Sequence, residues 1–244
     1  MSTKEFKLKN GLKVLLLESR KSPVVSMQAW VRTGSADETP AEAGLSHFIE
    51  HLLFKGTRKF KMGEIAQVIE GSGGELNAYT SFDQTVFYMT LSSKYMDTGL
   101  EALSDMMGFP TFDPAEIDAE REVVVEEMRR GNDSLGRQAS QLLFRSAYKS
   151  HPYGRPVIGL EKVVRGVSPA KLKKFFQSRY TPKNMFLILS GDFDAKNARQ
   201  KIEKTFGELK DYPLKKVKRP KITVPKKASI VVEKSTFEQS LTYL

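Results

Sequence analysis

Residues 44–54 of this chain read Gly44-Leu45-Ser46-His47-Phe48-Ile49-Glu50-His51-Leu52-Leu53-Phe54. Side chains three and four residues apart share one side of an α-helix. At that spacing the stretch has a broad apolar face, made of Leu45, Phe48, Ile49, Leu52 and Leu53. Thr39 suits the N-cap of such a helix and Pro40 its first position. The sequence therefore predicts an amphipathic helix that begins at Pro40 and buries one face.

A second face of this helix carries His47, Glu50 and His51 beside the apolar residues. The chain has three histidines, and two of them stand here, four residues apart. Two imidazoles at that spacing can bind one metal ion, and the Glu50 carboxylate can then take a proton from a metal-bound water. The order His-x-x-Glu-His is that of one class of zinc peptidases. The alternative is a pair of helix histidines that only form hydrogen bonds.

A zinc site of this kind needs a third protein ligand. The chain has no cysteine, and His151 is the remaining histidine, so a carboxylate is the natural candidate. Residues 114–130 predict a helix capped by Asp113, and helical periodicity sorts its glutamates into two groups. One face carries Glu120, Val123, Val124 and Glu127, and another carries Glu122, Glu126, Arg129 and Arg130.

The first of these two faces is unusual, because two carboxylates among two valines suit neither a solvated surface nor a plain core. The pattern is explained if Glu127 binds the metal and Glu120 orients one of the other ligands. The second face is explained by charge pairs in water. A charged amphipathic helix with an irregular apolar stripe is the alternative.

These motifs resemble those of the pitrilysin, insulinase and mitochondrial processing peptidase family, in its N-terminal half. Members of that family hold zinc with both histidines of His-x-x-Glu-His and with a distant glutamate. That glutamate ends a pattern of two glutamates seven residues apart, which Glu120 and Glu127 match. Further matching pieces are residues 30–35, 54–57, 73–80, 151–159 and 190–193. The pieces match the smaller bacterial and organellar processing peptidases better than the long insulin-degrading branch.

The resemblance implies a zinc-dependent endopeptidase that hydrolyses extended peptides or presequence-like segments, with Glu50 as the general base. It implies that Asn77 and Ala78 lie on an edge strand, where a substrate pairs as an added strand. Turn or strand-end chemistry explains Asn77 from the residues alone. His151 precedes a proline in a Pro/Gly-rich loop, so we expect it to be structural or to contact peptide, not to bind metal.

Other classes of function remain open on the sequence. One is a catalytically silent scaffold homologue, against which the intact Glu50, His47, His51 and Glu127 argue. Another is a module that binds metal or peptide without hydrolysis. A third is a fragment that is inactive without a second homologous half or subunit closing over its site, because members of the family resemble two similar halves joined by a linker.

The order of helical and strand patterns predicts an α+β fold, one half of a duplicated peptidase, with helices packed on a largely antiparallel sheet. Strands are predicted at residues 12–17, 24–31, 77–80, 85–91, 185–189 and 228–233, with another starting at 239. Further helices are predicted at residues 62–70, 95–109, 135–148, 169–179 and 194–206. We expect a zinc-peptidase domain over residues 1–209, a basic linker over 210–227, and the truncated start of a second half over 228–244.

Composition fits this picture without proving it. Of the 244 residues, 40% are hydrophobic and 28% charged, as in ordinary soluble globular proteins, and no apolar run reaches the length of a membrane span. The net charge is +10, but residues 210–227 hold eight Lys and Arg side chains against one Asp. Three prolines in that stretch favour an extended, solvated connector, and no aromatic platform supports binding of nucleic acid. We expect the bacterial cytoplasm or periplasm as the compartment.

Overall fold

The computed structural model describes residues 3–223 and 228–243. Six strands form one sheet in the spatial order β1-β2-β6-β3-β5-β4. Their bounds are β1 (Thr3–Lys7), β2 (Lys13–Glu18), β3 (Val24–Val31), β4 (Glu75–Thr80), β5 (Thr85–Ser92) and β6 (Met185–Gly191). β2 and β6 run parallel, and the other neighbouring pairs are antiparallel. The predicted α+β fold with a largely antiparallel sheet is confirmed.

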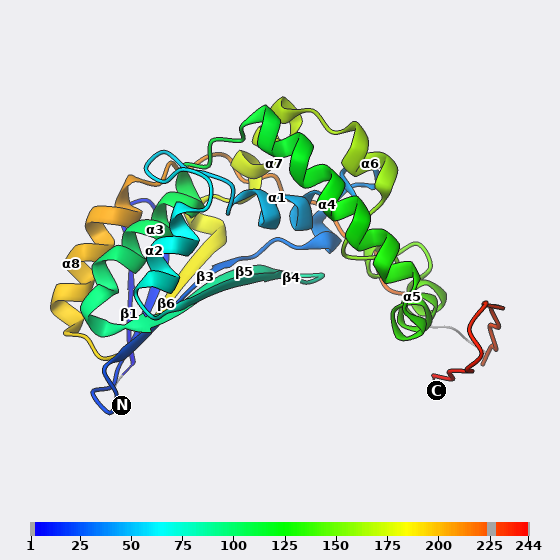
Figure 1. The fold of residues 1–244 in the computed structure, drawn as a ribbon, viewed down its shortest axis with the longest axis horizontal. Helices are drawn as coiled ribbons and strands as arrows, with labels where there is room; N and C mark the ends of the chain where they lie inside the picture. Colours follow the sequence, from blue (N-terminus) through cyan, green and yellow to red (C-terminus); the bar gives the residue numbers. More distant parts are fainter. Residues whose placement is uncertain (1–2, 224–227, 244) are drawn as a thin grey trace.

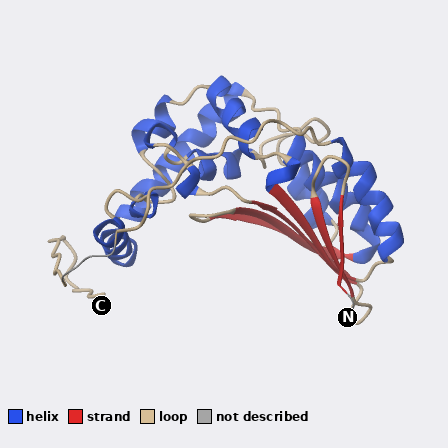
Figure 2. Cartoon of the chain, turned by 180° about the vertical axis from the view of Figure 1, so that it is seen from behind, coloured by secondary structure: helices blue, strands red, loops and turns tan. Residues whose placement is uncertain are grey.

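Helices cover one face of this sheet and leave the other face open (Figure 1, Figure 2). Their bounds are α1 (Leu45–Leu52), α2 (Glu64–Gly71), α3 (Met96–Gly108), α4 (Pro114–Asn132), α5 (Leu135–Tyr148), α6 (Glu161–Gly166), α7 (Pro169–Arg179) and α8 (Ala195–Thr205). Short 3₁₀ turns link them, of which η1 (Ser35–Asp37), η2 (Pro40–Glu42) and η4 (Pro152–Gly154) lie near the site described below.

The core lies between the sheet and this helical layer. In β3 the side chains of Val25, Met27, Ala29 and Val31 are fully buried, while the residues between them are partly exposed. Side chains of a strand alternate between its two faces, so this pattern is that of a sheet with one covered face. The predicted apolar face of α1 is buried in the same core: Leu45, Phe48, Ile49, Leu52 and Leu53 are each at most 4% exposed.

Most predicted elements lie within two residues of the observed ones, and three differences have physical reasons. α1 begins at Leu45 and not at Pro40, because Gly44 adopts a left-handed conformation (φ 102°) that ends the preceding turn. Thr39 and Pro40 instead open the separate turn η2, where Thr39 forms a capping box with Glu42. The sequence analysis missed β1 and α6, because β1 is mostly polar and α6 is six residues long.

The C-terminal part of the described chain lacks the predicted strands. Residues 228–233 and 239–243 form neither helix nor strand, although the first stretch is rich in β-branched residues. A strand exists through the hydrogen bonds of a neighbouring strand, and none of the six strands of the sheet lies beside this segment. The chain there runs beside α5, where Glu233 pairs with Arg145 at 2.7 Å (Figure 1).

Residues 210–223 of the predicted linker form neither helix nor strand, but they are not the solvated connector that the sequence predicts. Residues 224–227 of that linker lie outside the described residues. The backbone N–H of Lys215 donates to the carbonyl of Ser178 at 3.0 Å, and its ammonium group lies 3.0 Å from a carboxylate oxygen of Glu42. Arg219 forms an ion pair with Asp37 at 2.9 Å and a second one with Asp83. The segment therefore lies along the folded body over the turns that precede α1.

Candidate metal centre

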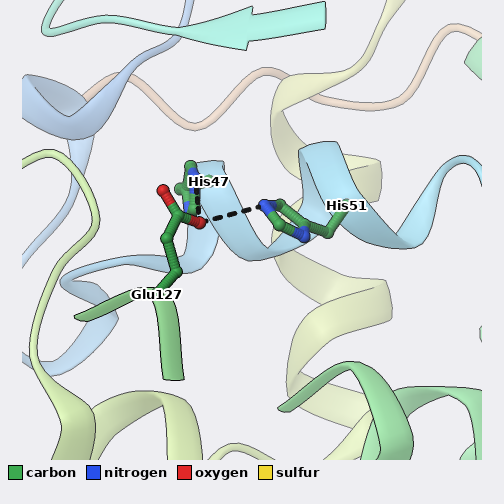
Figure 3. A group of neighbouring side chains, drawn as sticks. All are labelled: His47, His51 and Glu127. Atoms are coloured by element: carbon green, nitrogen blue, oxygen red, sulfur yellow. Dashed lines mark ion pairs between the residues drawn. The ribbon is translucent and has the colours of Figure 1, made fainter. Parts of the chain in front are cut away.

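The side chains that could bind a metal ion come from two helices that cross at the covered face of the sheet. His47 and His51 lie on α1, and Glu127 reaches them from α4 (Figure 3). A carboxylate oxygen of Glu127 lies 3.6 Å from Nε2 of His47 and 3.6 Å from Nε2 of His51. The structure thus brings Glu127 to two histidines that lie 80 and 76 positions before it in the sequence.

The donor set fits a zinc ion in type and in spacing. Two imidazole nitrogens and one carboxylate oxygen are the ligands that zinc takes in open, catalytic sites, and they lie within 4.8 Å of one another. Ligand atoms at about 2.1 Å from a tetrahedral zinc would stand about 3.4 Å apart, which is close to the 3.6 Å that separates the Glu127 oxygen from each histidine nitrogen. The Glu127 oxygen is therefore placed to share an ion with either histidine.

The protonation of His47 also suits metal binding. Burial lowers the pKa of His47 to about 3, with help from the positive charges of His51 and Arg137, so that its imidazole is neutral. A metal ligand must offer a nitrogen lone pair, which the neutral form has. Nδ1 of His47 is buried without a hydrogen-bond partner among the described residues.

His51 is oriented by Glu120, which is 5% exposed. Nδ1 of His51 lies 2.8 Å from one oxygen of Glu120, and the ammonium group of Lys55 lies 2.6 Å from the other. Burial alone would raise the pKa of Glu120, but the hydrogen bonds from His51 and Lys55 hold that pKa below its ordinary value. An ionised Glu120 fixes the proton of His51 on Nδ1 and leaves Nε2 facing Glu127.

Val123 is a point where the predicted face of α4 differs from the observed one. The sequence grouped Val123 with Glu120, Val124 and Glu127, but Val123 is 51% exposed whereas Val124 is fully buried. The buried side of α4 is therefore not the predicted stripe, because it includes Val125 and leaves out Val123. On the outer face Glu126 pairs with Arg129 and Arg130, at 3.6 and 3.7 Å, as predicted.

Glu50 lies beside the three ligand-type residues and is held from the sheet. The hydroxyl of Thr80, at the end of β4, donates to a carboxylate oxygen of Glu50 at 2.5 Å. Burial raises the pKa of Glu50, and the nearby charge of Glu127 adds to this effect. A carboxylate with a raised pKa is a stronger base than an ordinary one, which suits proton transfer.

The N-terminus of α1 is fixed by Glu38, which the sequence analysis did not single out. The buried carboxylate of Glu38 accepts hydrogen bonds from the backbone N–H groups of Gly44, at 2.8 Å, and Ser46, at 2.7 Å. These N–H groups have no partner within the helix, so the carboxylate caps it. Glu38 lies six residues before Gly44, the first residue that it caps, so no local sequence pattern predicts the contact. Predicting it would require the conformation of the intervening turn η2. Lys55 and Thr80 lie within the stretches that carried the resemblance, but no spacing rule assigned them a partner.

The remaining predicted residues lie outside the group of three ligand-type residues. Asn77 and Ala78 are in β4, the edge strand of the sheet, and Asn77 turns its side-chain oxygen onto the backbone N–H of Ala78 at 2.8 Å. His151 is buried and is not part of the group of three ligand-type residues; it caps η4, where its Nδ1 accepts a hydrogen bond from the backbone N–H of Tyr153 at 3.2 Å.

Comparison with known proteins identifies the family of this chain. Residues 13–161 match the family described as insulinase (peptidase family M16), and residues 166–244 match the peptidase M16 inactive domain. The zinc protease PqqE of Helicobacter pylori is 33% identical over 223 residues, which are 90% of this chain and 50% of that protein. The uncharacterized zinc protease YmxG of Bacillus subtilis is 31% identical over 204 residues, which are 84% of this chain and 50% of YmxG.

A solved structure shows the same fold. The first half of the periplasmic protease PqqL from Escherichia coli superposes with a TM-score of 0.81 at 29% identity, covering 93% of this chain and 49% of that one. This chain spans about half the length of the curated relatives that it matches. The family resemblance seen in the motifs is confirmed, and the chain belongs to the insulinase family of peptidases, peptidase family M16.

Proposed function

We propose that this chain is the metal-binding half of a zinc-dependent endopeptidase that hydrolyses extended peptides or presequence-like segments. The observation that supports this most strongly is the convergence of His47, His51 and Glu127, with Glu50 beside them. The names of relatives as zinc proteases support the same class of activity.

In this proposal His47, His51 and Glu127 hold the ion. When bound, zinc would supply a Lewis acid and would make a water molecule more acidic. Glu50 takes a proton from the attacking water and delivers it to the nitrogen of the leaving amine. Thr80 keeps the carboxylate of Glu50 in place, and Glu120 keeps the ring of His51 in place.

The peptide would pair with the edge strand β4. Its outer side is free of any strand of the described sheet, and Asn77 and Ala78 lie in its middle. An extended peptide that adds to such an edge places its backbone in a fixed register, so that one peptide bond reaches the metal.

Residues 1–209 would form the zinc-peptidase domain, residues 210–227 the linker, and residues 228–244 the start of a second half that closes over the site. The match to about half of each relative supports the existence of a second half. The alternative is that the chain binds zinc and peptide but hydrolyses substrate only together with that second half. The C-terminal family match is described as an inactive domain, which favours this alternative. The compartment proposed is the bacterial cytoplasm or periplasm, and the periplasmic PqqL relative supports the latter.

The first experiment measures zinc in purified wild type and in Glu127→Gln by elemental analysis. We expect about one zinc per chain in wild type and little in the variant, because a neutral amide is a poor zinc ligand. Absence of zinc in wild type, even after zinc is added back, would overturn the proposal.

The second experiment compares peptide hydrolysis by wild type and by Glu50→Gln. The variant should keep its zinc and lose hydrolysis, because glutamine accepts no proton. Hydrolysis that persists in Glu50→Gln would exclude Glu50 as the base. Zinc binding without hydrolysis in either protein would favour a fragment that needs its second half.

A further inference from the structure

A cavity of about 290 Å³ lies beside the candidate metal centre, between α5, Phe82 of the β4–β5 turn and residues 154–158. A second cavity, of about 210 Å³, is lined by His47 and Glu127 themselves. The two share Arg137, Gln141, Val157 and Ile158 as lining residues, so they adjoin. Small-molecule sites typically measure roughly 300–1,000 Å³, so the larger cavity suits a single side chain.

Arg137 is the one arginine in residues 3–223 and 228–243 whose guanidinium has no ion pair, hydrogen bond or aromatic ring as a partner. Its recorded hydrogen bond comes from its backbone N–H, which donates to Ser134. Each of the other arginines has such a partner; for Arg32 it is the ring of Phe186. The Arg137 guanidinium lies over Gly131, 3.4 Å from where a Cβ would stand there, and Gly131 follows Glu127 by one helical turn of α4.

The charge of the larger cavity is positive. Arg155 lines it together with Arg137, and no Asp or Glu is among its lining residues. Arg155 donates through Nη2 to the backbone carbonyl of Glu38 at 2.6 Å, while its Nε is buried without a partner among the described residues. The acid nearest in sequence to Phe82, Asp83, already accepts from the hydroxyl of Tyr153 and pairs with Arg219.

One wall of the cavity is apolar and well packed. The rings of Phe82 and Phe144 stack with their centroids 5.2 Å apart, and Phe82 also lies 4.8 Å from the ring of Tyr153. Such a wall suits the methylene groups of a side chain whose charged end reaches a guanidinium. A guanidinium binds a carboxylate through two parallel hydrogen bonds, which makes it selective for that group.

We propose that this cavity is a specificity subsite that binds an acidic side chain, glutamate or aspartate, of the peptide substrate near the bond to be cleaved. Arg137 binds the carboxylate of this side chain, and Phe82 and Phe144 pack against its methylene groups. The inference rests on the proposed peptidase function, because it needs a peptide seated at the metal centre.

The test uses fluorescent peptides of one core sequence, acetylated and amidated so that side chains carry the only carboxylates. Glutamate, glutamine and lysine are placed in turn at each position around the centre of the peptide. Their affinities for the full chain carrying Glu50→Gln and loaded with zinc are measured by fluorescence anisotropy. The same peptides are then offered to the zinc-loaded chain with Glu50 intact, and hydrolysis is followed.

At one position we expect the glutamate peptide to bind about tenfold more tightly than the glutamine peptide, which is the size of one charge-assisted contact. Arg137→Gln should make the two affinities equal, and Arg137→Glu should favour lysine. Arg137 is exposed, so these changes should leave the melting temperature unaltered. The matched control is Arg145→Gln, on the same helix but outside both cavities, which should keep the preference for glutamate.

The subsite proposal is overturned if glutamate is preferred at no position, if the preference survives Arg137→Gln, or if no peptide binds. Failure of the proposed function gives a different result. In that case the preference for glutamate appears in the binding assay, while the chain with Glu50 intact hydrolyses none of the peptides.

Discussion

Glu120 shows how much of this site depends on single contacts. A buried carboxylate between His51 and Lys55 is stable because each of its oxygens meets a positively charged or proton-donating group. The sequence predicted that Glu120 orients a metal ligand, because Glu120 shares a helix face with apolar residues and lies on a different face from the charge pairs. It could not predict Lys55 as the second partner, because Lys55 lies beyond the end of α1, where helical spacing no longer applies.

Glu120→Gln should weaken zinc binding by about 10- to 100-fold, because the amide cannot hold the His51 proton as firmly as a carboxylate does. Competition with a chelating dye of known zinc affinity measures the change. The control is Glu126→Gln on the exposed side of α4, which should bind zinc as wild type does. Equal affinities in all three proteins would show that Glu120 does not orient His51.

Glu38 is a second residue whose effect depends on burial. Burial raises the pKa of Glu38 from 4.5 to about 7, against the opposing hydrogen bonds from Gly44 and Ser46 and the charge of Arg155. A carboxyl group with a raised pKa binds its proton more tightly in the folded state than in the unfolded state. Its contribution to stability is therefore complete below pH 4.5 and is lost as the pH rises through about 7.

We predict that the difference in unfolding free energy between wild type and Glu38→Gln falls by about 3 kcal/mol from pH 4.5 to pH 8. Glutamine does not titrate, so the difference isolates Glu38 from other titrating groups. Urea unfolding of both proteins in chelator, at several pH values, measures it. A difference that is constant with pH, or that grows as pH rises, would contradict the raised pKa.

At the scale of elements, α1 shows why the presence of a helix is easier to predict than the residues at which it begins and ends. Its apolar spacing identified the helix and its buried face. The start was predicted at Pro40, because Thr39 and Pro40 have the local features of a helix start, which they do supply to η2. What ends that turn is Gly44, which has a positive φ and packs closely against Gly159, more than a hundred residues later.

Gly44→Ala should destabilise the fold by about 3 kcal/mol, by backbone strain and by collision. A Cβ at Gly44 would lie 2.7 Å from the carbonyl oxygen of Ile158. The control is Gly63→Ala at the start of α2, where φ is also positive but no atom lies within 4 Å. That variant should lose about 1 kcal/mol by strain alone. Thermal and urea unfolding compare the two, and similar losses would mean that the contact with Ile158 does not constrain α1.

At the scale of the whole molecule, the basic segment after residue 209 connects distant parts of the fold. Arg219 joins η1, through Asp37, to the β4–β5 turn, through Asp83, and Lys215 contacts Glu42 of η2. The turns η1 and η2 both precede α1. The segment that leads toward the proposed second half is therefore held beside the turns that position α1, the helix that carries His47 and His51. Within the described ranges, no helix is both long and apolar enough to cross a membrane.

Arg219→Gln should loosen this segment and speed hydrogen exchange of the amides in residues 212–220 by about fivefold, as expected for about 1 kcal/mol of ion pairing. The Lys215 amide, which donates to Ser178, is the amide to follow. Lys218→Gln, an exposed lysine of the same segment with no recorded partner, is the control. Unchanged exchange in Arg219→Gln would show that the backbone contacts alone hold the segment.

The sequence by itself determined the local features of this protein. In the part of the chain that the structure describes, periodicity identified seven of the eight helices and five of the six strands. It also identified the apolar face of α1, because each of these features is encoded by residues near one another in the chain. Asp113, Ser134 and Ser168 cap α4, α5 and α7 through their own side chains for the same reason. The spacing of His47, Glu50 and His51 on one helix was equally local.

Tertiary structure decided whatever depends on contact between distant segments. The parallel pairing of β2 with β6, the capping of α1 by Glu38, the bond from Thr80 to Glu50, and the cavity around Arg137 all join residues far apart in sequence. The failure of residues 228–233 to form a strand has the same cause, because β-branched residues favour a strand that only a neighbouring strand can complete.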